Sequence, residues 1–188
     1  MTGAPAIEVA GVSKSYRRAK KLALANVDLV VEEGEILGLV GPNGAGKTTF
    51  MGCLLGLLFP SSGSIRIDGR TPDDLTLRRQ TGYLPERLQF DRWMTGRAFI
   101  DHHHCLAGLP AAHRTGDVTA VLQRVGLEPA AWLTPIKNYS RGMLQRLGMA
   151  QALLGDPRFL FLDEPASGVD PAGVLAFRDI LLDLRQRA

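Results

Sequence analysis

The sequence lacks the marks of a secreted, membrane-spanning or disulfide-bonded protein. No charged N-terminal region precedes an apolar stretch with a small-residue cleavage site, and no apolar run approaches the roughly 20 residues that cross a bilayer. Its 2 cysteines, Cys53 and Cys105, lie far apart and form no C-x-x-C pair. We therefore expect both to be reduced, Cys53 to pack in a helix, and the protein to be cytoplasmic.

Repeats, low-complexity tracts and a basic stripe are also missing. The balance of 45% hydrophobic to 22% charged residues over 188 positions predicts one soluble globular domain. The net charge is +3, but the basic residues are scattered, which argues against nucleic-acid binding. One tight basic cluster is expected to be a solvated turn between strands, with phosphate or lipid contact as the alternative. It comprises Arg17, Arg18, Lys20 and Lys21.

What the sequence does contain is a glycine-rich loop between two apolar segments, residues 36–40 and 50–58. The loop consists of Gly41, Pro42, Asn43, Gly44, Ala45, Gly46, Lys47 and Thr48. Its glycines allow successive backbone N–H groups to line one concave surface, and a helix that starts near Lys47 adds its positive end. Lys47 can reach the β and γ phosphates of a nucleotide, and the Thr48 hydroxyl can ligate Mg²⁺. The order of strand, loop and helix favours a phosphate site over a chance turn.

Hydrophobic patterning predicts two kinds of strand. The β-branched residues of segments 7–12 and 27–31, with segment 64–67 as one arm of a hairpin, predict an N-terminal antiparallel region. Residues 35–40 form a short apolar run that ends at the loop, as expected of a strand buried on both faces in a parallel core sheet. Residues 158–162 are expected to form another buried strand.

Between these core strands the pattern becomes helical. Helices are expected at residues 99–106, 118–125 and 143–154, separated by glycine and proline breaks, within a helical insertion at about residues 87–156. A final helix at residues 172–187 carries an apolar stripe. The stripe comprises Val174, Leu175, Phe177, Ile180, Leu181 and Leu184.

Two acidic residues follow the second buried strand. Asp163 ends this strand and is placed to hold a metal ion, directly or through water. Glu164 comes next and could accept a proton from an attacking water or orient it, since hydrolysis at a γ phosphate depends on positioning and charge stabilisation. An acidic turn is the alternative, and the phosphate loop in the same chain disfavours it.

A third segment, residues 139–146, precedes a helical run. Ser140 is a good N-cap, and Gly142 leaves backbone donors uncovered near the helix start. Such a helix end carries roughly half a positive charge and can bind an anion. Alone, this pattern is ordinary helix capping.

With these motifs in this order, the chain resembles the ATP-binding cassette family, the nucleotide-binding subunits of ABC transporters. GPNGAGKTT at residues 41–49 matches the family's Walker A motif, and FLFLDEP at residues 159–165 matches Walker B with its catalytic glutamate. YSRGM at residues 139–143 matches the signature sequence, and SGVD at residues 167–170 resembles the D-loop. Tyr16 sits where the family stacks an aromatic ring on adenine. The resemblance covers essentially the whole chain.

The resemblance implies an α/β P-loop NTPase fold with a parallel core sheet, an N-terminal antiparallel β subdomain and an inserted helical subdomain. The nucleotide-binding core would comprise residues 1–86 and 157–188, and residues 87–156 would form the helical subdomain that carries the signature. The implied ligands are ATP and Mg²⁺. Beyond the loop residues listed above, the implied nucleotide contacts are Tyr16, Thr49, Ser140, Gly142 and Asp170.

A shared mechanism follows from the resemblance, in which two cassettes close head to tail around two ATP molecules. Ser140 and Gly142 would contact the nucleotide held by the second cassette, and Asp170 would lie at the dimer seam. A homodimer bound to a separately encoded transmembrane permease, on the cytoplasmic face of the cell membrane, would hydrolyse ATP to drive transport. The alternative is a soluble ABC-type ATPase that is not coupled to transport.

The chain departs from the family pattern in some motif residues and at its C-terminal end. Glu86 stands where the family usually has a glutamine that contacts the metal and water; its carboxylate could still ligate Mg²⁺, but it adds negative charge beside the triphosphate. The sequences GYLPE and YSRGM at these two motifs resemble those of bacterial ABC-2 type exporters. The family's switch histidine has no counterpart before Ala188, so the chain resembles a cassette truncated at its C-terminus. We expect weak or no hydrolysis by these 188 residues alone, with ATP binding partly retained.

A run of Asp101, three histidines and Cys105 suggests a metal site by composition alone. Adjacent helical residues point about 100° apart, so His102, His103 and His104 cannot converge on one ion. Pairs at usable spacing make only half of a tetrahedral set. We therefore expect a solvated helix face near the permease.

Overall fold

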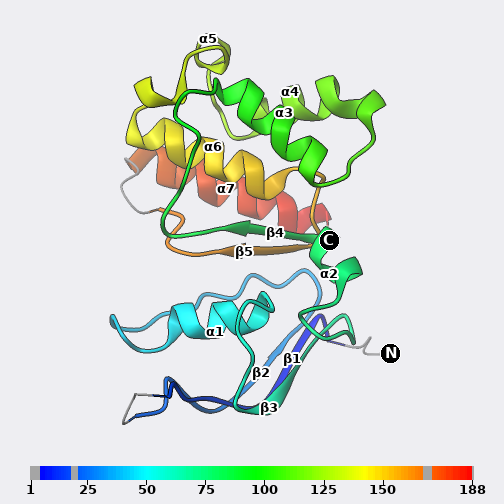
Figure 1. Ribbon diagram of the computed structural model, residues 1–188, viewed down its shortest axis with the longest axis vertical. Helices are drawn as coiled ribbons and strands as arrows, with labels where there is room; N and C mark the ends of the chain where they lie inside the picture. Colours follow the sequence, from blue (N-terminus) through cyan, green and yellow to red (C-terminus); the bar gives the residue numbers. More distant parts are fainter. Residues whose placement is uncertain (1–4, 18–20, 167–170, 188) are drawn as a thin grey trace. The chain divides into compact units, whose positions relative to one another are not determined.

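The computed structural model of the chain describes residues 5–17, 21–166 and 171–187. The chain packs as two compact units (Figure 1). The first is formed by residues up to 79 together with the chain end from residue 185, and the second by residues 80–184. Each unit has its own sheet and its own buried side chains.

The first unit is built on a three-stranded antiparallel sheet in the order β2-β1-β3. Its strands are β1 (Ile7–Lys14), β2 (Leu24–Val31) and β3 (Ser62–Ile67). Val9 of the central strand pairs with Leu29 on one side and Ile65 on the other. This sheet confirms the predicted antiparallel region. The long partner of β3 is β1, however, rather than a following hairpin arm, because the chain turns away after the single bridge between Ile67 and Arg70.

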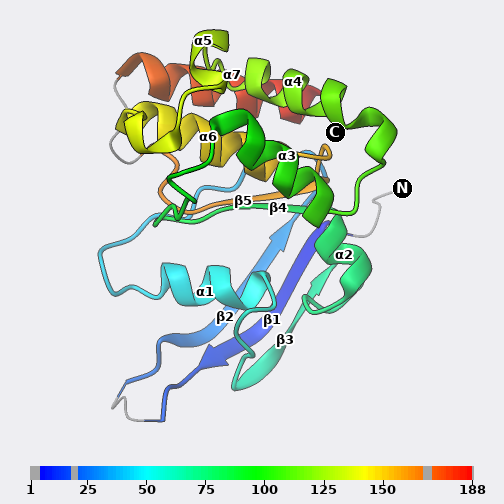
Figure 2. The same cartoon turned by 45° about the horizontal axis from the view of Figure 1, so that its top comes forward.

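Helix α1 (Lys47–Leu54) lies beside this sheet (Figure 2), and the short helix α2 (Leu75–Arg79) follows β3. The buried side chains of α1 include Phe50, Cys53 and Leu54. The predicted helical placement of Cys53 is confirmed, and burial raises the pKa of its thiol. This thiol is therefore a packing group rather than a nucleophile.

The predicted core strand at residues 35–40 is not formed. No ladder among the described strands includes these residues, and Ile36, Leu37, Leu39 and Val40 are exposed, Val40 by 94%. A strand requires a hydrogen-bonded neighbour, and a run of apolar residues does not supply one. The prediction of a buried strand here is therefore wrong, and the parallel sheet of the structure consists of two other strands.

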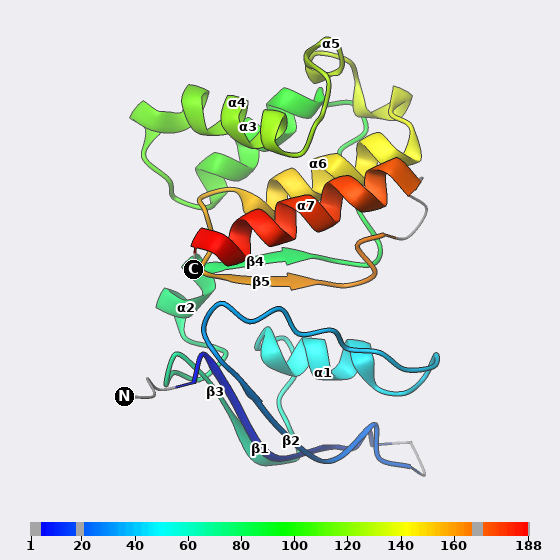
Figure 3. The same ribbon diagram turned by 180° about the vertical axis from the view of Figure 1, so that it is seen from behind.

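Those two strands, β4 (Thr81–Leu84) and β5 (Phe159–Leu162), form the sheet of the second unit. They are parallel and in register from Thr81 with Phe159 to Leu84 with Leu162. Helices α6 (Arg141–Leu153) and α7 (Pro171–Arg187) lie over the same side of this pair (Figure 3). The predicted strand at residues 158–162 and the predicted final helix are thus confirmed. Only part of the predicted stripe of α7 is covered, since Phe177 and Ile180 are buried while Leu175 is 50% exposed.

The remaining helices complete the second unit, and the two longer ones pack against α6. They are α3 (Gly96–Leu106), α4 (Arg114–Arg124) and the short α5 (Pro129–Trp132), with single 3-10 turns η1 (Ala111–His113) and η2 (Ile136–Asn138) between them. One buried cluster joins these helices to β4 and α7, with Ile100, Leu122 and Leu147 fully buried. The three predicted helices of this region are confirmed. None of the described helices is both long and apolar enough to cross a membrane.

The histidine run does not form a solvated face. His104 is fully buried on the same side of α3 as Ile100, and its Nε2 lies 2.9 Å from Asp117 Oδ2 of α4. His103 packs on the Phe99 ring, and burial is the main cause that lowers its pKa. Successive residues sweep about 100° around a helix, so one of three consecutive residues is carried to the apolar side. The expectation of a solvated face is correct for His102 and Cys105, which are exposed.

Candidate functional site

The glycine-rich loop leads directly into α1, and its backbone requires glycine. Gly44 has φ +81°, and Gly46, the N-cap of α1, has φ +95°. A Cβ atom at Gly46 would collide with the carbonyl oxygen of Ala23, whereas one at Gly44 would meet open space. The loop is thus held against the residue that precedes β2, and the start of α1 adopts the left-handed conformation that glycine allows.

Lys47 folds back across this loop. Its Nζ donates to the carbonyl oxygens of Gly41 at 2.7 Å and Pro42 at 3.2 Å. The first turn of α1 carries no acidic residue, so no side-chain charge there offsets the positive helix end. The Lys47 ammonium group and the first N–H groups of α1 therefore adjoin one glycine-rich turn, which is an arrangement suited to binding polyphosphate.

Tyr16 approaches the same helix from the end of β1. Its hydroxyl lies 3.3 Å from Thr49 Oγ1, and the Lys14 ammonium lies 5.7 Å from the centre of its ring. The ring remains 43% exposed. The exposed face of the Tyr16 ring, next to the loop, fits the position expected for stacking on a base. The contact with Thr49 links Tyr16 to α1.

Asp163, Glu164 and Glu86 follow the two parallel strands of the second unit. Asp163 is buried and its backbone N–H donates to the Leu84 carbonyl at 2.9 Å, while Glu86 and Glu164 are exposed. Burial first, and then the negative charges of Asp163 and Glu86, raise the pKa of the Tyr83 hydroxyl. The carboxylates of Asp163 and Glu86 therefore both lie near the Tyr83 hydroxyl, at the carboxyl ends of β4 and β5.

The donors at this edge fit Mg²⁺ only in part. Carboxylate oxygens are the ligands that Mg²⁺ prefers, and Asp163 and Glu86 supply them. Among the described residues no group of three or more acidic, histidine or cysteine side chains could hold a metal ion. An ion at this edge would therefore take further oxygen ligands from phosphates or water, as Mg²⁺ commonly does.

Ser140 is the N-cap of α6, as predicted. Its backbone is extended, its Oγ accepts from the Met143 N–H at 3.2 Å, and the helix has no acidic residue in its first turn. A Cβ added at Gly142 would meet no atom within 4 Å. The helix start is thus capped, positively polarised and sterically open on the Gly142 side.

Asp170 lies outside the described residues, together with Ser167, Gly168 and Val169.

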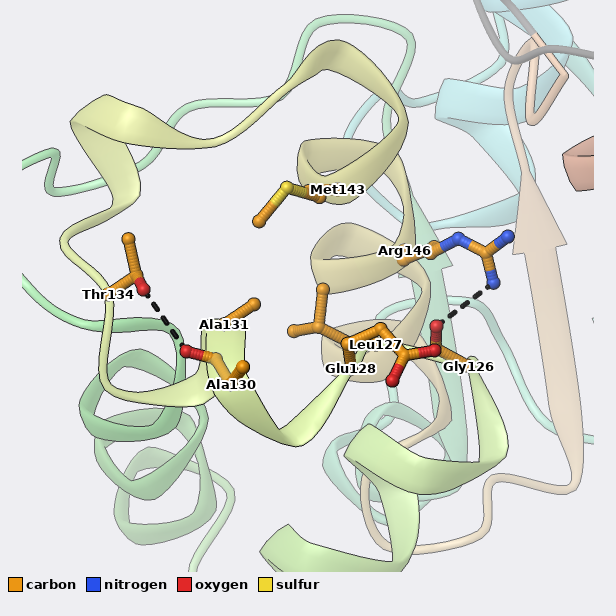
Figure 4. Close-up of a pocket in the computed structure, with 8 residues that line it drawn as sticks. All are labelled: Gly126, Leu127, Glu128, Ala130, Ala131, Thr134, Met143 and Arg146. Atoms are coloured by element: carbon orange, nitrogen blue, oxygen red, sulfur yellow. Dashed lines mark hydrogen bonds between the residues drawn. The ribbon is translucent and has the colours of Figure 1, made fainter.

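A surface pocket is lined by residues of α5, α6 and the turn after α4 (Figure 4). Within it Arg146 donates to the carbonyls of Val125 at 2.8 Å and Gly126 at 3.3 Å. Its lining includes Met143 of the signature sequence but none of the predicted nucleotide, metal or catalytic residues.

Sequence reasoning missed two residues that hold the α6 segment in place. The Tyr139 hydroxyl donates to the Ala131 carbonyl at 2.7 Å, and the buried Gln145 amide donates to the Pro165 carbonyl at 2.7 Å. Gln145 occupies a helix face that is otherwise apolar, with Gly148, Met149 and Ala152 buried further along. A single polar residue on an apolar helix face is a sequence feature that could have identified Gln145 as a buried hydrogen-bonding residue.

We expect Gly46→Ala to lower the free energy of unfolding by about 1 to 3 kcal/mol more than Gly44→Ala does. Both substitutions place a Cβ on a left-handed backbone, but only the one at Gly46 also meets the Ala23 carbonyl. Urea denaturation followed by circular dichroism measures the difference. Equal destabilisation by the two substitutions would contradict the steric role of Gly46.

Comparison with known proteins agrees with these motifs. Residues 24–167 match the family described as ABC transporter (ABC_tran). The chain is 43% identical over 180 residues to the ABC transporter ATP-binding protein YxlF of Bacillus subtilis, covering 96% of this chain and 59% of that protein. It is 37% identical over 186 residues to the methionine import ATP-binding protein MetN 2 of Paraburkholderia xenovorans, covering 96% and 48%.

Among solved structures, the fold is similar to a dimeric post-hydrolysis state of the ATP-binding cassette MJ0796 bound to ADP and Pi. The TM-score is 0.85 at 24% identity, and the match covers 96% of this chain and 83% of that one. The predicted α/β P-loop fold is thereby confirmed. The chain spans between 51% and 59% of the length of the first curated relatives it matches. Since the family match covers most of the chain, including the glycine-rich loop, the capped start of α6 and the Asp163–Glu164 pair, the chain belongs to the ABC transporter family.

Proposed function

We propose that this chain is the ATP-binding and ATP-hydrolysing part of a subunit that drives an ABC transporter. The observation that carries the proposal is the loop geometry. Lys47 lies across a turn in which two glycines have positive φ, directly before a helix with no acid in its first turn. The charge and backbone of this turn suit a triphosphate.

Roles for the other residues follow from their positions. The backbone of residues 41–48 and the Lys47 ammonium would hold the phosphates, and Tyr16 would stack on the adenine. Thr48, Asp163 and Glu86 would ligate Mg²⁺, which when bound offsets the negative charge of the phosphates. Glu164 would accept the proton of the attacking water, since it is exposed directly after the buried Asp163.

A second copy of the cassette is the proposed partner for the open start of α6. The Ser140-capped helix end offers N–H groups and a partial positive charge to an anion, and Gly142 leaves room for its approach. We propose that Ser140 and Gly142 contact the γ phosphate held by the other copy and that Asp170 lies at the seam. Residues 87–156 would then act as the helical subdomain that presents this helix end.

We further propose that a separate permease anchors the dimer on the cytoplasmic face of the cell membrane and that transport is outward. The names of the relatives support a transporter, and the GYLPE and YSRGM spellings favour export, whereas MetN 2 is named an import protein. A multispan membrane protein in the neighbouring reading frame would support this assignment over a soluble ABC-type ATPase. Transport assays in vesicles with both subunits would give the direction.

Gly142→Ala tests the composite site. We expect it to raise the free energy of unfolding by about 0.5 to 1 kcal/mol, because alanine is the better helix former and its methyl group meets open space. The same methyl group would stand between the helix start and an incoming phosphate, so dimerisation driven by Mg²⁺ and an ATP analogue should weaken about tenfold or more. Analytical ultracentrifugation of the full-length protein measures this association.

The matched control is Gly116→Ala in α4, where an added Cβ also meets no atom within 4 Å. It should stabilise the fold by a similar amount and leave association unchanged. If Gly142→Ala dimerises as the parent does, the start of α6 does not contact the second nucleotide and the proposed dimer is wrong.

A further inference from the structure

Gln145 connects α6 to the segment that follows β5. Its side chain is 6% exposed, and its Nε2 donates to the Pro165 carbonyl oxygen at 2.7 Å. Gln145 lies 5 positions after the capping residue Ser140 and is the one buried polar side chain among the described residues of α6. Breaking this hydrogen bond is costly because the buried Gln145 amide would then lack a partner.

Between this bond and β5 the backbone is unusual. Glu164 has φ +53°, a left-handed conformation that non-glycine residues adopt at a cost of about 1 to 2 kcal/mol. Pro165 follows it and disfavours the right-handed helical alternative. Glu164 therefore holds a strained conformation that must be maintained by contacts on either side of it.

The structure supplies one contact on each side. Before Glu164, the Asp163 N–H donates to the Leu84 carbonyl at 2.9 Å and fixes the chain to β4. After Glu164, the Gln145 amide holds the Pro165 carbonyl. These two hydrogen bonds fix the backbone direction at Glu164, and with it the point from which the exposed carboxylate extends.

We propose that Gln145 is a positioning residue for Glu164. By anchoring the Pro165 carbonyl, it keeps Glu164 in its left-handed conformation and its carboxylate at the place where it orients water and accepts a proton. This inference rests on the proposed ATPase function. Loss of the anchor allows the strained residue to relax, and small displacements of a general base reduce the rate of the chemical step far more than they reduce substrate binding.

Gln145→Glu tests the positioning role in the full-length protein. The substitution preserves shape, but an ionised carboxylate cannot donate to a carbonyl, so kcat at pH 8 should fall about tenfold while KM for ATP changes less than about twofold. Lowering the pH protonates the buried carboxyl and restores a donor, so the ratio of its kcat to that of the parent should rise between pH 8 and pH 6. Gln151→Glu in the same helix is the matched control and should show neither effect.

Gln145→Leu provides a readout that does not depend on turnover. In the 188-residue chain, amide hydrogen exchange of a peptide covering residues 160–166 should quicken about fivefold, while Gln151→Leu leaves it unchanged. Unchanged exchange in Gln145→Leu, or a kcat ratio for Gln145→Glu that is flat with pH, would overturn the positioning role. A parent protein that binds no ATP would instead refute the proposed function, and the exchange measurement would still decide whether Gln145 holds this segment.

Discussion

Lys47→Ala should weaken ATP binding about 100-fold or more. The substitution removes a charged donor from the phosphates, and hydrogen bonds to charged groups contribute about 1.5 to 3 kcal/mol each. It also removes two hydrogen bonds inside the loop, because Lys47 Nζ donates to the carbonyls of Gly41 and Pro42. Loss of these bonds frees the turn whose shape presents the N–H groups, so the affinity loss should exceed that of a distant lysine.

Equilibrium titration with a fluorescent ATP analogue, with and without Mg²⁺, measures the change. Lys137→Ala is the control, since Lys137 is an exposed lysine on η2 in the second unit. Circular dichroism should show that both variants fold. If the Lys47 variant binds ATP within a few-fold of the parent, the glycine-rich loop is not the phosphate site and the proposed function loses its main support.

Local chemistry explains why the loop and the helices could be predicted. The glycine spacing at Gly44 and Gly46 matches their positive φ values, and Ser140 caps α6 because a serine hydroxyl satisfies a free N–H at a helix start. The apolar spacing likewise predicted α3, α4 and α6 to within a few residues. In each of these cases the information lies within one turn or one loop of the residue concerned.

Features that depend on distant partners could not be predicted in this way. Residues 35–40 have the composition of a buried strand, but pairing decides whether a strand forms, and no described ladder includes them. The sequence predicts a solvated His104, whereas in the structure this residue is buried and contacts Asp117 of α4. The bond from Gln145 to Pro165 joins residues 20 positions apart, and only the packing of α6 over β5 brings them together.

Glu164→Gln should lower kcat about 100-fold or more in the full-length protein while ATP binding is retained. The amide has the size of the carboxylate, so the left-handed backbone at Glu164 and the bond to Pro165 should persist. A neutral amide cannot accept the proton of the attacking water, and general-base catalysis contributes about 10² to 10⁴ in rate. Because ATP then persists in the composite site, a closed dimer should accumulate.

Steady-state hydrolysis and gel filtration with Mg²⁺ and ATP measure the two effects together. Glu128→Gln removes an exposed carboxylate from the same unit and should alter neither hydrolysis nor association. The combination of outcomes is what identifies the role, because a merely damaged fold would lose both turnover and the dimer. Unchanged hydrolysis in Glu164→Gln would exclude Glu164 as the base, and would leave Gln145 holding a strained turn that serves no chemical step.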